Sequence, residues 1–242
     1  METTINRYLD HAVLAPELSR NDAVAAIRAG IAYAVRTVCV RPCDIALARE
    51  LCAGTQTAVC CVLDFPHGTG GAEAKESLAK AFISQGAAEI DMVMNYGFAL
   101  SGLWDKVEDE IARVVGQAHD RGVLVKVIFE TSEWPLDIVG RGVEACVSAG
   151  ADFVKTSTGF SKSGATEEVV REMLRVAGNR ILVKPSGGIR DYAAAMKYVG
   201  MGCARLGVGF KSTPLICSGP SGGAGTKGAD GQAEGGQPSL RY

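Results

Sequence analysis

Two lysines lie inside runs that otherwise have the composition of buried β-strands. Lys155 lies within Ala-Asp-Phe-Val-Lys-Thr-Ser-Thr-Gly-Phe, and Lys184 within Ile-Leu-Val-Lys-Pro-Ser-Gly-Gly-Ile-Arg. A buried ammonium group is costly unless it is paired or loses its proton. An unprotonated amine attacks carbonyl groups and forms Schiff bases. The pair therefore indicates covalent, lysine-based catalysis. The alternative is a structural lysine that is paired with a carboxylate such as Asp91.

Short apolar runs alternate with helical patterns along most of the chain. The predicted strands are 8–11, 37–40, 58–63, 89–94, 123–130, 153–156, 181–185 and 204–208. The predicted helices between them are 21–35, 72–85, 103–121, 137–149, 166–177 and 191–199. Several strands are almost continuously apolar, as parallel strands buried on both faces are. This order predicts an α/β protein with a (β/α)8 TIM barrel. An open doubly wound sheet is the alternative, which the lack of a G-x-G-x-x-G after the first strand disfavours.

Polar side chains gather near the carboxyl ends of the predicted strands, where barrel enzymes place their active sites. These residues are Asp10, Arg41, Asp64, Asp91, Asn95, Glu130, Lys155 and Lys184. Lys126 and Glu130 share parity on one strand and are expected to face the same side. Two interpretations stay open for Glu130, a core ion pair or support of catalysis. Arg41 and Asp64 are expected to pair with each other across the barrel mouth.

Composition narrows the class of partner. The chain has 242 residues, of which 47% are apolar and 21% charged, values typical of a soluble globular protein. A formal net charge of −2 gives no attraction to nucleic acid. No apolar run reaches the roughly 18 residues of a membrane span, and residues 1–8 lack the pattern of a signal peptide. We therefore expect a cytoplasmic protein with a small-molecule substrate and neither a nucleic-acid nor a membrane partner.

The eight cysteines show no metal-binding pattern. They form no C-x-x-C pair and have no histidines at zinc-finger spacing. Most lie in apolar stretches, so we expect buried, reduced thiols. Cys39 is the exception, because it lies at the end of a predicted strand and is a candidate for contact with the substrate.

The order and spacing of the motifs resemble those of the deoxyribose-phosphate aldolases, which are class I (Schiff-base) aldolases on a (β/α)8 barrel. The resemblance extends from Tyr8 to about Gly209, and the run around Lys155 is its most specific part. The other matching motifs are Tyr-Leu-Asp-His at 8–11, Val-Cys-Val-x-Pro at 38–42, Phe-Pro-His-Gly at 65–68, Glu-Ile-Asp-Met-Val-Met-Asn at 89–95, Ser-Gly at 101–102, Lys-Val-Ile-x-Glu-Thr at 126–131 and Lys-x-Ser-Gly-Gly-Ile-Arg at 184–190.

The resemblance implies catalytic roles for four residues. Lys155 would form the Schiff base, and Lys184 would lie nearby as a second ammonium whose charge helps to keep Lys155 neutral. Asp91 would move protons together with Lys184 and an ordered water, and Lys126 would pair with Asp91. The implied reaction is the reversible cleavage of 2-deoxy-D-ribose 5-phosphate to D-glyceraldehyde 3-phosphate and acetaldehyde. A Schiff base absorbs the electron pair, so the reaction needs no metal or organic cofactor.

The resemblance also implies a phosphate cradle of backbone amides around the ends of the last strands. The candidate substrate-binding residues are Gly159, Gly187, Gly188, Gly207, Gly209, Lys211 and Cys39. The chain departs from the family at 208–211, where Val-Gly-Phe-Lys replaces a hydroxyl-rich run. Lys211 would replace the lost interaction; the alternative is a site without phosphate preference.

The end of the chain also departs from the family. No regular helix is evident after the last strand, because Pro214 and a Gly-rich segment follow too soon. One flank of the barrel would then be exposed or covered by a partner subunit, which leaves room for a homodimer. We divide the chain into an aldolase barrel over 1–217 and a flexible tail over 218–242, with a lid carrying Tyr242 as the alternative for the tail. Two alternative functions stay open. One is a catalytically impaired barrel that binds sugar phosphates, and the other is a related Schiff-base aldolase with altered acceptor preference.

Overall fold

The computed structural model describes residues 4–220, and within them eight parallel strands form one sheet. The strands are β1 (Leu9–Val13), β2 (Thr37–Val40), β3 (Ala58–Leu63), β4 (Glu89–Val93), β5 (Leu124–Ile128), β6 (Phe153–Lys155), β7 (Leu182–Lys184) and β8 (Leu206–Gly209). Neighbours in sequence pair with each other, and β1 also pairs with β8. A bridge between Ser186 and Gly207 joins the β7 and β8 ends. The sheet thus closes into the predicted (β/α)8 barrel.

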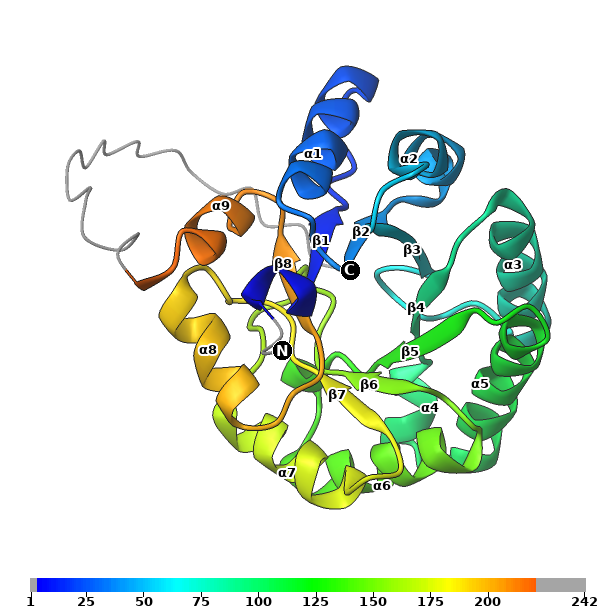
Figure 1. The fold of residues 1–242 in the computed structure, drawn as a ribbon. Helices are drawn as coiled ribbons and strands as arrows, with labels where there is room; N and C mark the ends of the chain where they lie inside the picture. The colour runs from blue at the N-terminus through cyan, green and yellow to red at the C-terminus, as the bar shows by residue number, and fades with distance from the viewer. Residues whose placement is uncertain (1–3, 221–242) are drawn as a thin grey trace, which may run out of the picture.

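Helices surround the strands on the outside (Figure 1). The longer ones are α1 (Arg20–Ala32), α2 (Ile45–Cys52), α3 (Ala72–Gln85), α5 (Trp104–His119), α6 (Leu136–Ser148), α7 (Glu167–Ala177) and α8 (Tyr192–Gly200). Short elements are α4 (Tyr96–Leu100), α9 (Thr213–Cys217), η1 (Ile5–Tyr8), η2 (Pro42–Asp44) and η3 (Thr131–Glu133). The side chains of Ser19, Thr166 and Asp191 cap the first turns of α1, α7 and α8, which explains why those helices begin where they do.

The sequence pattern located most elements closely. The predicted strands 37–40 and 58–63 and the predicted helix 72–85 agree with β2, β3 and α3. The first strand begins one residue later than predicted and runs on to Val13, because Tyr8 belongs to η1. The pattern missed α2 and α4. No side chain caps α2, and α4 has only five residues, so each lacks a strong sequence signal.

The expectation that no regular helix follows the last strand is wrong for the described residues, because α9 follows β8. Pro214 lies in the first turn of α9, where a missing backbone N–H leaves no hydrogen bond unmade. The Thr213 hydroxyl lies 2.8 Å from His11 Nδ1, and Ile216 is buried, so this short helix is tied to the barrel. The predicted tail lies mostly outside the described residues, as does Tyr242. None of the described helices is long and apolar enough to cross a membrane.

The two faces of the strands differ in character, since side chains alternate between them. On β4, Ile90 and Met92 join the apolar layer between strands and helices, whereas Asp91 faces the barrel interior. Charged side chains occupy much of that interior, and the apolar layer outside shields them from water. The fold therefore places ionisable groups in a region of low dielectric, where their interactions are strong.

Candidate active site

Strand register brings the predicted catalytic residues together. Asp91 on β4 is the register partner of Lys126 on β5, and Lys155 on β6 is the partner of Lys184 on β7. Register partners on one face of a sheet lie close enough for their side chains to interact. Closure of the barrel then brings the Lys155–Lys184 pair to Asp91.

Asp91 joins three ammonium groups. Its Oδ2 atom accepts hydrogen bonds from Lys155 Nζ and Lys184 Nζ, each at 2.7 Å. Its Oδ1 atom accepts from Lys126 Nζ at 2.8 Å and from Cys60 Sγ at 3.2 Å. Burial raises the pKa of Asp91, but the three lysines outweigh it and hold that pKa well below its usual range. Asp91 is therefore an ionised carboxylate that is fully buried.

Further ion pairs connect these lysines to two other carboxylates. Asp10 Oδ2 lies 2.5 Å from Lys184 Nζ, and Glu89 Oε2 lies 2.5 Å from Lys126 Nζ. Arg205 bridges the two carboxylates, with NH1 2.7 Å from Asp10 Oδ1 and 2.8 Å from Glu89 Oε2. The connected groups, which we call the charge cluster, are Asp10, Glu89, Asp91, Lys126, Lys155, Lys184 and Arg205. Four cations face three carboxylates, so one positive charge is in excess when every group is ionised.

The three lysines differ in their number of carboxylate partners. Lys126 lies within 4 Å of the three carboxylates Asp10, Glu89 and Asp91, whereas Lys184 contacts two and Lys155 one. Burial lowers the pKa of Lys184, but Asp10 and Asp91 outweigh it, and the pKa is raised above its ordinary value. The pKa of Lys126 is raised in the same way, with Asp91 as the main partner. Lys126 and Lys184 are thus held as ammonium ions.

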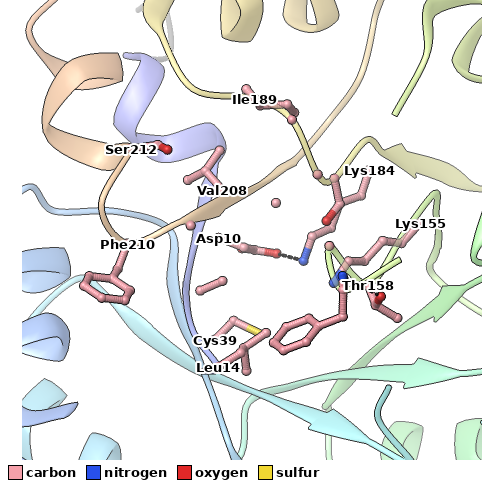
Figure 2. A pocket seen from close by; sticks show the side chains of 18 of the residues that line it. Asp10, Leu14, Cys39, Lys155, Thr158, Lys184, Ile189, Val208, Phe210 and Ser212 are labelled. Atoms are coloured by element: carbon pink, nitrogen blue, oxygen red, sulfur yellow. Dashed lines mark hydrogen bonds and ion pairs between the residues drawn. The ribbon is translucent and has the colours of Figure 1, made fainter. Parts of the chain in front are cut away.

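A cavity of about 300 Å³ opens above the charge cluster at the carboxyl ends of the strands. Lys155, Lys184 and Asp10 line it, and Leu14 and Val208 form part of its apolar wall (Figure 2). Asp91 and Lys126 do not line the cavity and lie beneath it, so a small molecule in the cavity would meet the two lysines first.

The structure brings most of the predicted substrate-binding residues to this cavity. Those that line it are Cys39, Gly159, Gly187, Gly188, Gly207 and Gly209. Lys211 does not line it, and its ammonium group lies 5.7 Å from the centre of the Phe210 ring. The position of Lys211 in the structure therefore differs from the predicted position among the residues that line the substrate site.

Glycine is required at these positions of the cavity wall for different structural reasons. Gly187 and Gly188 have φ angles of 83° and 80°, a left-handed conformation that glycine adopts without strain. At Gly207 a Cβ atom would lie 2.6 Å from Ser186 Oγ, so this glycine permits the close approach of β7 and β8. The cavity also contains Arg190 and Ser212, which the sequence interpretation missed. Arg190 stands in the Gly-Gly-Ile-Arg motif, and that position was a usable signal.

Glu130 lies beyond the end of β5 and holds the loop after β6. Its Oε2 atom accepts hydrogen bonds from the backbone N–H and the hydroxyl of Thr158, a residue of the cavity wall. Burial raises the pKa of Glu130. Its Oε1 atom is buried without a hydrogen-bond partner among the described residues. The sequence left two interpretations of Glu130 open, a core ion pair or support of catalysis. Its hydrogen bonds to Thr158 fit the second, because they hold a residue of the cavity wall.

The predicted pairing of Arg41 with Asp64 is wrong. Arg41 Nε lies 2.7 Å from Asp44, and Asp64 accepts from the backbone N–H of Gly70 at 2.7 Å. Asp64 also lies 3.5 Å from the buried Lys75. Each side chain finds a partner close to its own loop and does not reach across the barrel mouth.

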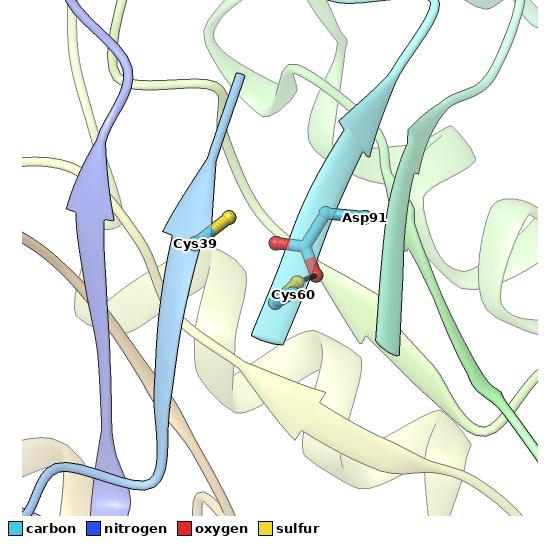
Figure 3. Close-up of side chains that lie close together, drawn as sticks. All are labelled: Cys39, Cys60 and Asp91. Carbon is cyan, nitrogen blue, oxygen red and sulfur yellow. Dashed lines mark hydrogen bonds between the residues drawn. The ribbon is translucent and has the colours of Figure 1, made fainter. Parts of the chain in front are cut away.

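Cys39, Cys60 and Asp91 form a compact group whose potential metal-binding atoms lie within 4.8 Å of one another (Figure 3). Both Asp91 oxygens already accept hydrogen bonds from ammonium groups. A divalent cation here would be repelled by three positive charges at close range. The group therefore does not suit a metal ion.

The fold and the site define a class of protein, a (β/α)8 barrel with lysine amines aimed into a cavity at the carboxyl ends of its strands. The family model described as DeoC/LacD family aldolase matches residues 4–207. The chain belongs to this aldolase family.

The chain is similar in sequence to curated proteins over most of their length. The deoxyribose-phosphate aldolase of Treponema denticola is 36% identical over 203 residues, which cover 84% of this chain and 94% of that protein. The deoxyribose-phosphate aldolase of a Geobacillus species is 41% identical over 207 residues, which cover 86% and 92%.

Solved structures share the same architecture. The structure titled "QR15, an Aldolase" has a TM-score of 0.83 at 34% identity and covers 88% of this chain and 94% of its own. The deoxyribose phosphate aldolase from Aeropyrum pernix, described as tetrameric, has a TM-score of 0.81 at 29% identity and covers 88% and 89%.

Replacing Arg205 by methionine tests how strongly the charge cluster is coupled to folding. We expect Arg205→Met to lower the free energy of unfolding by roughly 3–5 kcal/mol, because it leaves Asp10 and Glu89 short of a buried partner. The matched control is Arg180→Met, which removes an exposed pair with Glu144 and should cost at most about 1 kcal/mol. Urea denaturation measures both, and equal losses in the two variants would contradict the coupling.

Proposed function

We propose that this protein is a class I aldolase that reversibly cleaves 2-deoxy-D-ribose 5-phosphate to D-glyceraldehyde 3-phosphate and acetaldehyde. The observation that carries the proposal is the position of Lys155. Its amine lies at the cavity, 2.7 Å from Asp91, and has the fewest carboxylate partners of the three lysines. Family membership and the names of the relatives support the same substrate.

The proposed reaction begins when the neutral Lys155 amine adds to the aldehyde carbon of the open-chain sugar and water leaves. The resulting imine is protonated and accepts electrons, so the C2–C3 bond of the sugar breaks. Its electron pair forms an enamine, and the C3 hydroxyl loses its proton as glyceraldehyde 3-phosphate departs. Protonation of the enamine and addition of water then release acetaldehyde and restore the amine.

The charge cluster supports this sequence of steps. With Lys155 neutral, three cations face three carboxylates, so the reactive form of the nucleophile also balances the buried charge. Lys184 donates to Asp91 and Asp10 beside the cavity, and we assign it the transfer of protons to and from the substrate together with Asp91 and a water. Lys126 keeps Asp91 ionised and in place.

The phosphate of the substrate would lie at the rim of the cavity. The backbone around Gly187 and Gly188 leaves room for an anion, and Arg190 and Ser212 offer a guanidinium and a hydroxyl. We assign the phosphate to these groups in place of Lys211. Phe210 also lines the cavity, and its apolar ring offers the phosphate no hydrogen bond, unlike the hydroxyl groups of the run that the family has at 208–211.

The proposed setting is the cytoplasm. All eight cysteines are unpaired in the structure, as is usual for proteins of a reducing compartment. The proposed partner is a small-molecule substrate, and the homodimer suggested by the sequence stays a prediction.

Borohydride trapping tests the nucleophile. Incubation with acetaldehyde or deoxyribose 5-phosphate, followed by reduction and digestion, should place the mass adduct on Lys155 and abolish activity. Lys155→Met should give no adduct, while the control Lys162→Ala, an exposed lysine of the following loop, should keep it. Absence of an adduct from folded protein would contradict the aldolase proposal and favour a barrel that only binds sugar phosphates.

Steady-state kinetics test the phosphate position. We expect Arg190→Ala to raise KM for deoxyribose 5-phosphate roughly tenfold, the effect of losing one hydrogen bond to a charged group. Lys211→Ala should change KM by less than about twofold, because Lys211 is exposed and does not line the cavity. The reverse order of effects would return the phosphate to Lys211.

A further inference from the structure

Cys39 and Cys60 face each other on neighbouring strands of the barrel. They are register partners between β2 and β3, and their sulfur atoms lie within 4.8 Å of each other (Figure 3). Strands in a sheet lie about 4.8 Å apart, which is within the Cα separation that a disulfide accepts. Closing the sulfur–sulfur gap to about 2 Å thus requires side-chain rotation with little movement of the backbone.

The two sulfurs differ in access. Cys39 is 1% exposed but lines the active-site cavity, beside Leu14 in Figure 2, so it is the member of the pair that a small molecule in the cavity would meet. Cys60 is fully buried behind it, and burial raises the pKa of its thiol well above the ordinary value. Cys61, the next residue, belongs to the apolar cluster on the other face of β3. Among the described residues, Cys60 is therefore the thiol placed to react with a modified Cys39.

The pair is also connected to the charge cluster. Cys60 Sγ donates to Asp91 Oδ1 at 3.2 Å and lies 3.5 Å from Lys126 Nζ. A bond between the two sulfurs removes this donor and draws the Cys60 sulfur toward β2. Asp91 then loses one of the contacts that hold its carboxylate between the three lysines.

We propose that Cys39 and Cys60 form an oxidative modification site, in which hydrogen peroxide that enters the cavity converts the pair to a disulfide and inactivates the enzyme reversibly. The Cys39 sulfur attacks the peroxide, the O–O bond breaks, and sulfenic acid and one water form. The Cys60 sulfur then attacks the sulfenic sulfur, the S–O bond breaks, and hydroxide leaves with the Cys60 proton as a second water. Two thiols lose two electrons, which the peroxide gains.

The loss of activity rests on the proposed aldolase function, but the disulfide does not. We expect full-length protein treated with hydrogen peroxide, alkylated and digested without reductant to yield a Cys39–Cys60 cross-linked peptide. Its aldolase activity should fall roughly tenfold or more, the effect of losing a hydrogen bond to a charged group, and should return with dithiothreitol.

Two kinds of variant make the experiment selective. Cys43→Ser removes an exposed thiol near β2 and should leave the cross-link, the inactivation and its reversal unchanged. Cys60→Ser and Cys60→Ala should give no cross-linked peptide, and dithiothreitol should not restore their activity after Cys39 is oxidised further. Two substitutions are made at Cys60 so that the test still stands if one of the two variants fails to fold.

Either of two results would overturn the inference. One is the absence of the cross-linked peptide under conditions that fully oxidise Cys43. The other is a cross-linked enzyme that keeps its activity. Failure of the aldolase proposal is recognised separately, because untreated protein would then form no borohydride adduct on Lys155.

Discussion

One buried carboxylate organises the interior of this barrel. Asp91 accepts hydrogen bonds from three lysines on three other strands. Lys155 would be an isolated buried charge without it, whereas Lys126 and Lys184 also pair with other carboxylates. The arrangement depends on strand register, since a shift of one residue on β4 would turn Asp91 outward and Ile90 or Met92 inward. The apolar layer beneath the helices matters for the same reason, because it keeps water from screening the contacts. Fold and chemistry thus depend on the same set of contacts.

The lysines share this carboxylate unequally, and the inequality separates their roles. Lys126 lies deepest and has the most carboxylate partners, so it serves to hold Asp91. Lys184 is held as an ammonium between Asp10 and Asp91 at the cavity. Lys155 has a single carboxylate partner and lines the cavity. A positive charge in excess across the cluster is removed when Lys155 is neutral, and that is the form which adds to an aldehyde.

Sequence patterns were sufficient to predict the barrel and to select the four side chains that meet inside it, which are Asp91, Lys126, Lys155 and Lys184. Alternating apolar runs and helices predicted the strand order, and the lysines stood out because a charge inside an apolar strand is costly. The same reasoning did not find Arg205, which immediately precedes β8 and extends into the barrel to contact Asp10 and Glu89. Arg205 lies within the predicted strand 204–208, so a charge inside an apolar run was a usable signal there as well.

Loops were the weaker part of the prediction, because their contacts depend on closure of the whole barrel. Lys211 had the right charge but lies outside the cavity, while Ser212, the next residue, lines it. Arg41 and Asp64 were expected to meet and instead pair within their own surroundings. The pairing of Cys39 with Cys60 emerges only from the register of β2 and β3, which no spacing of cysteines along the chain reveals.

We expect Asp91 to order the lysines for proton transfer as well as for stability. Exchange of the methyl protons of acetaldehyde in D₂O, followed by proton NMR, reports enamine formation and protonation without any carbon–carbon cleavage. We predict that Asp91→Asn, shown to be folded by circular dichroism, slows this exchange by roughly a hundredfold or more, the effect of removing a positioned acid–base group. Exchange at the wild-type rate in the folded variant would contradict it.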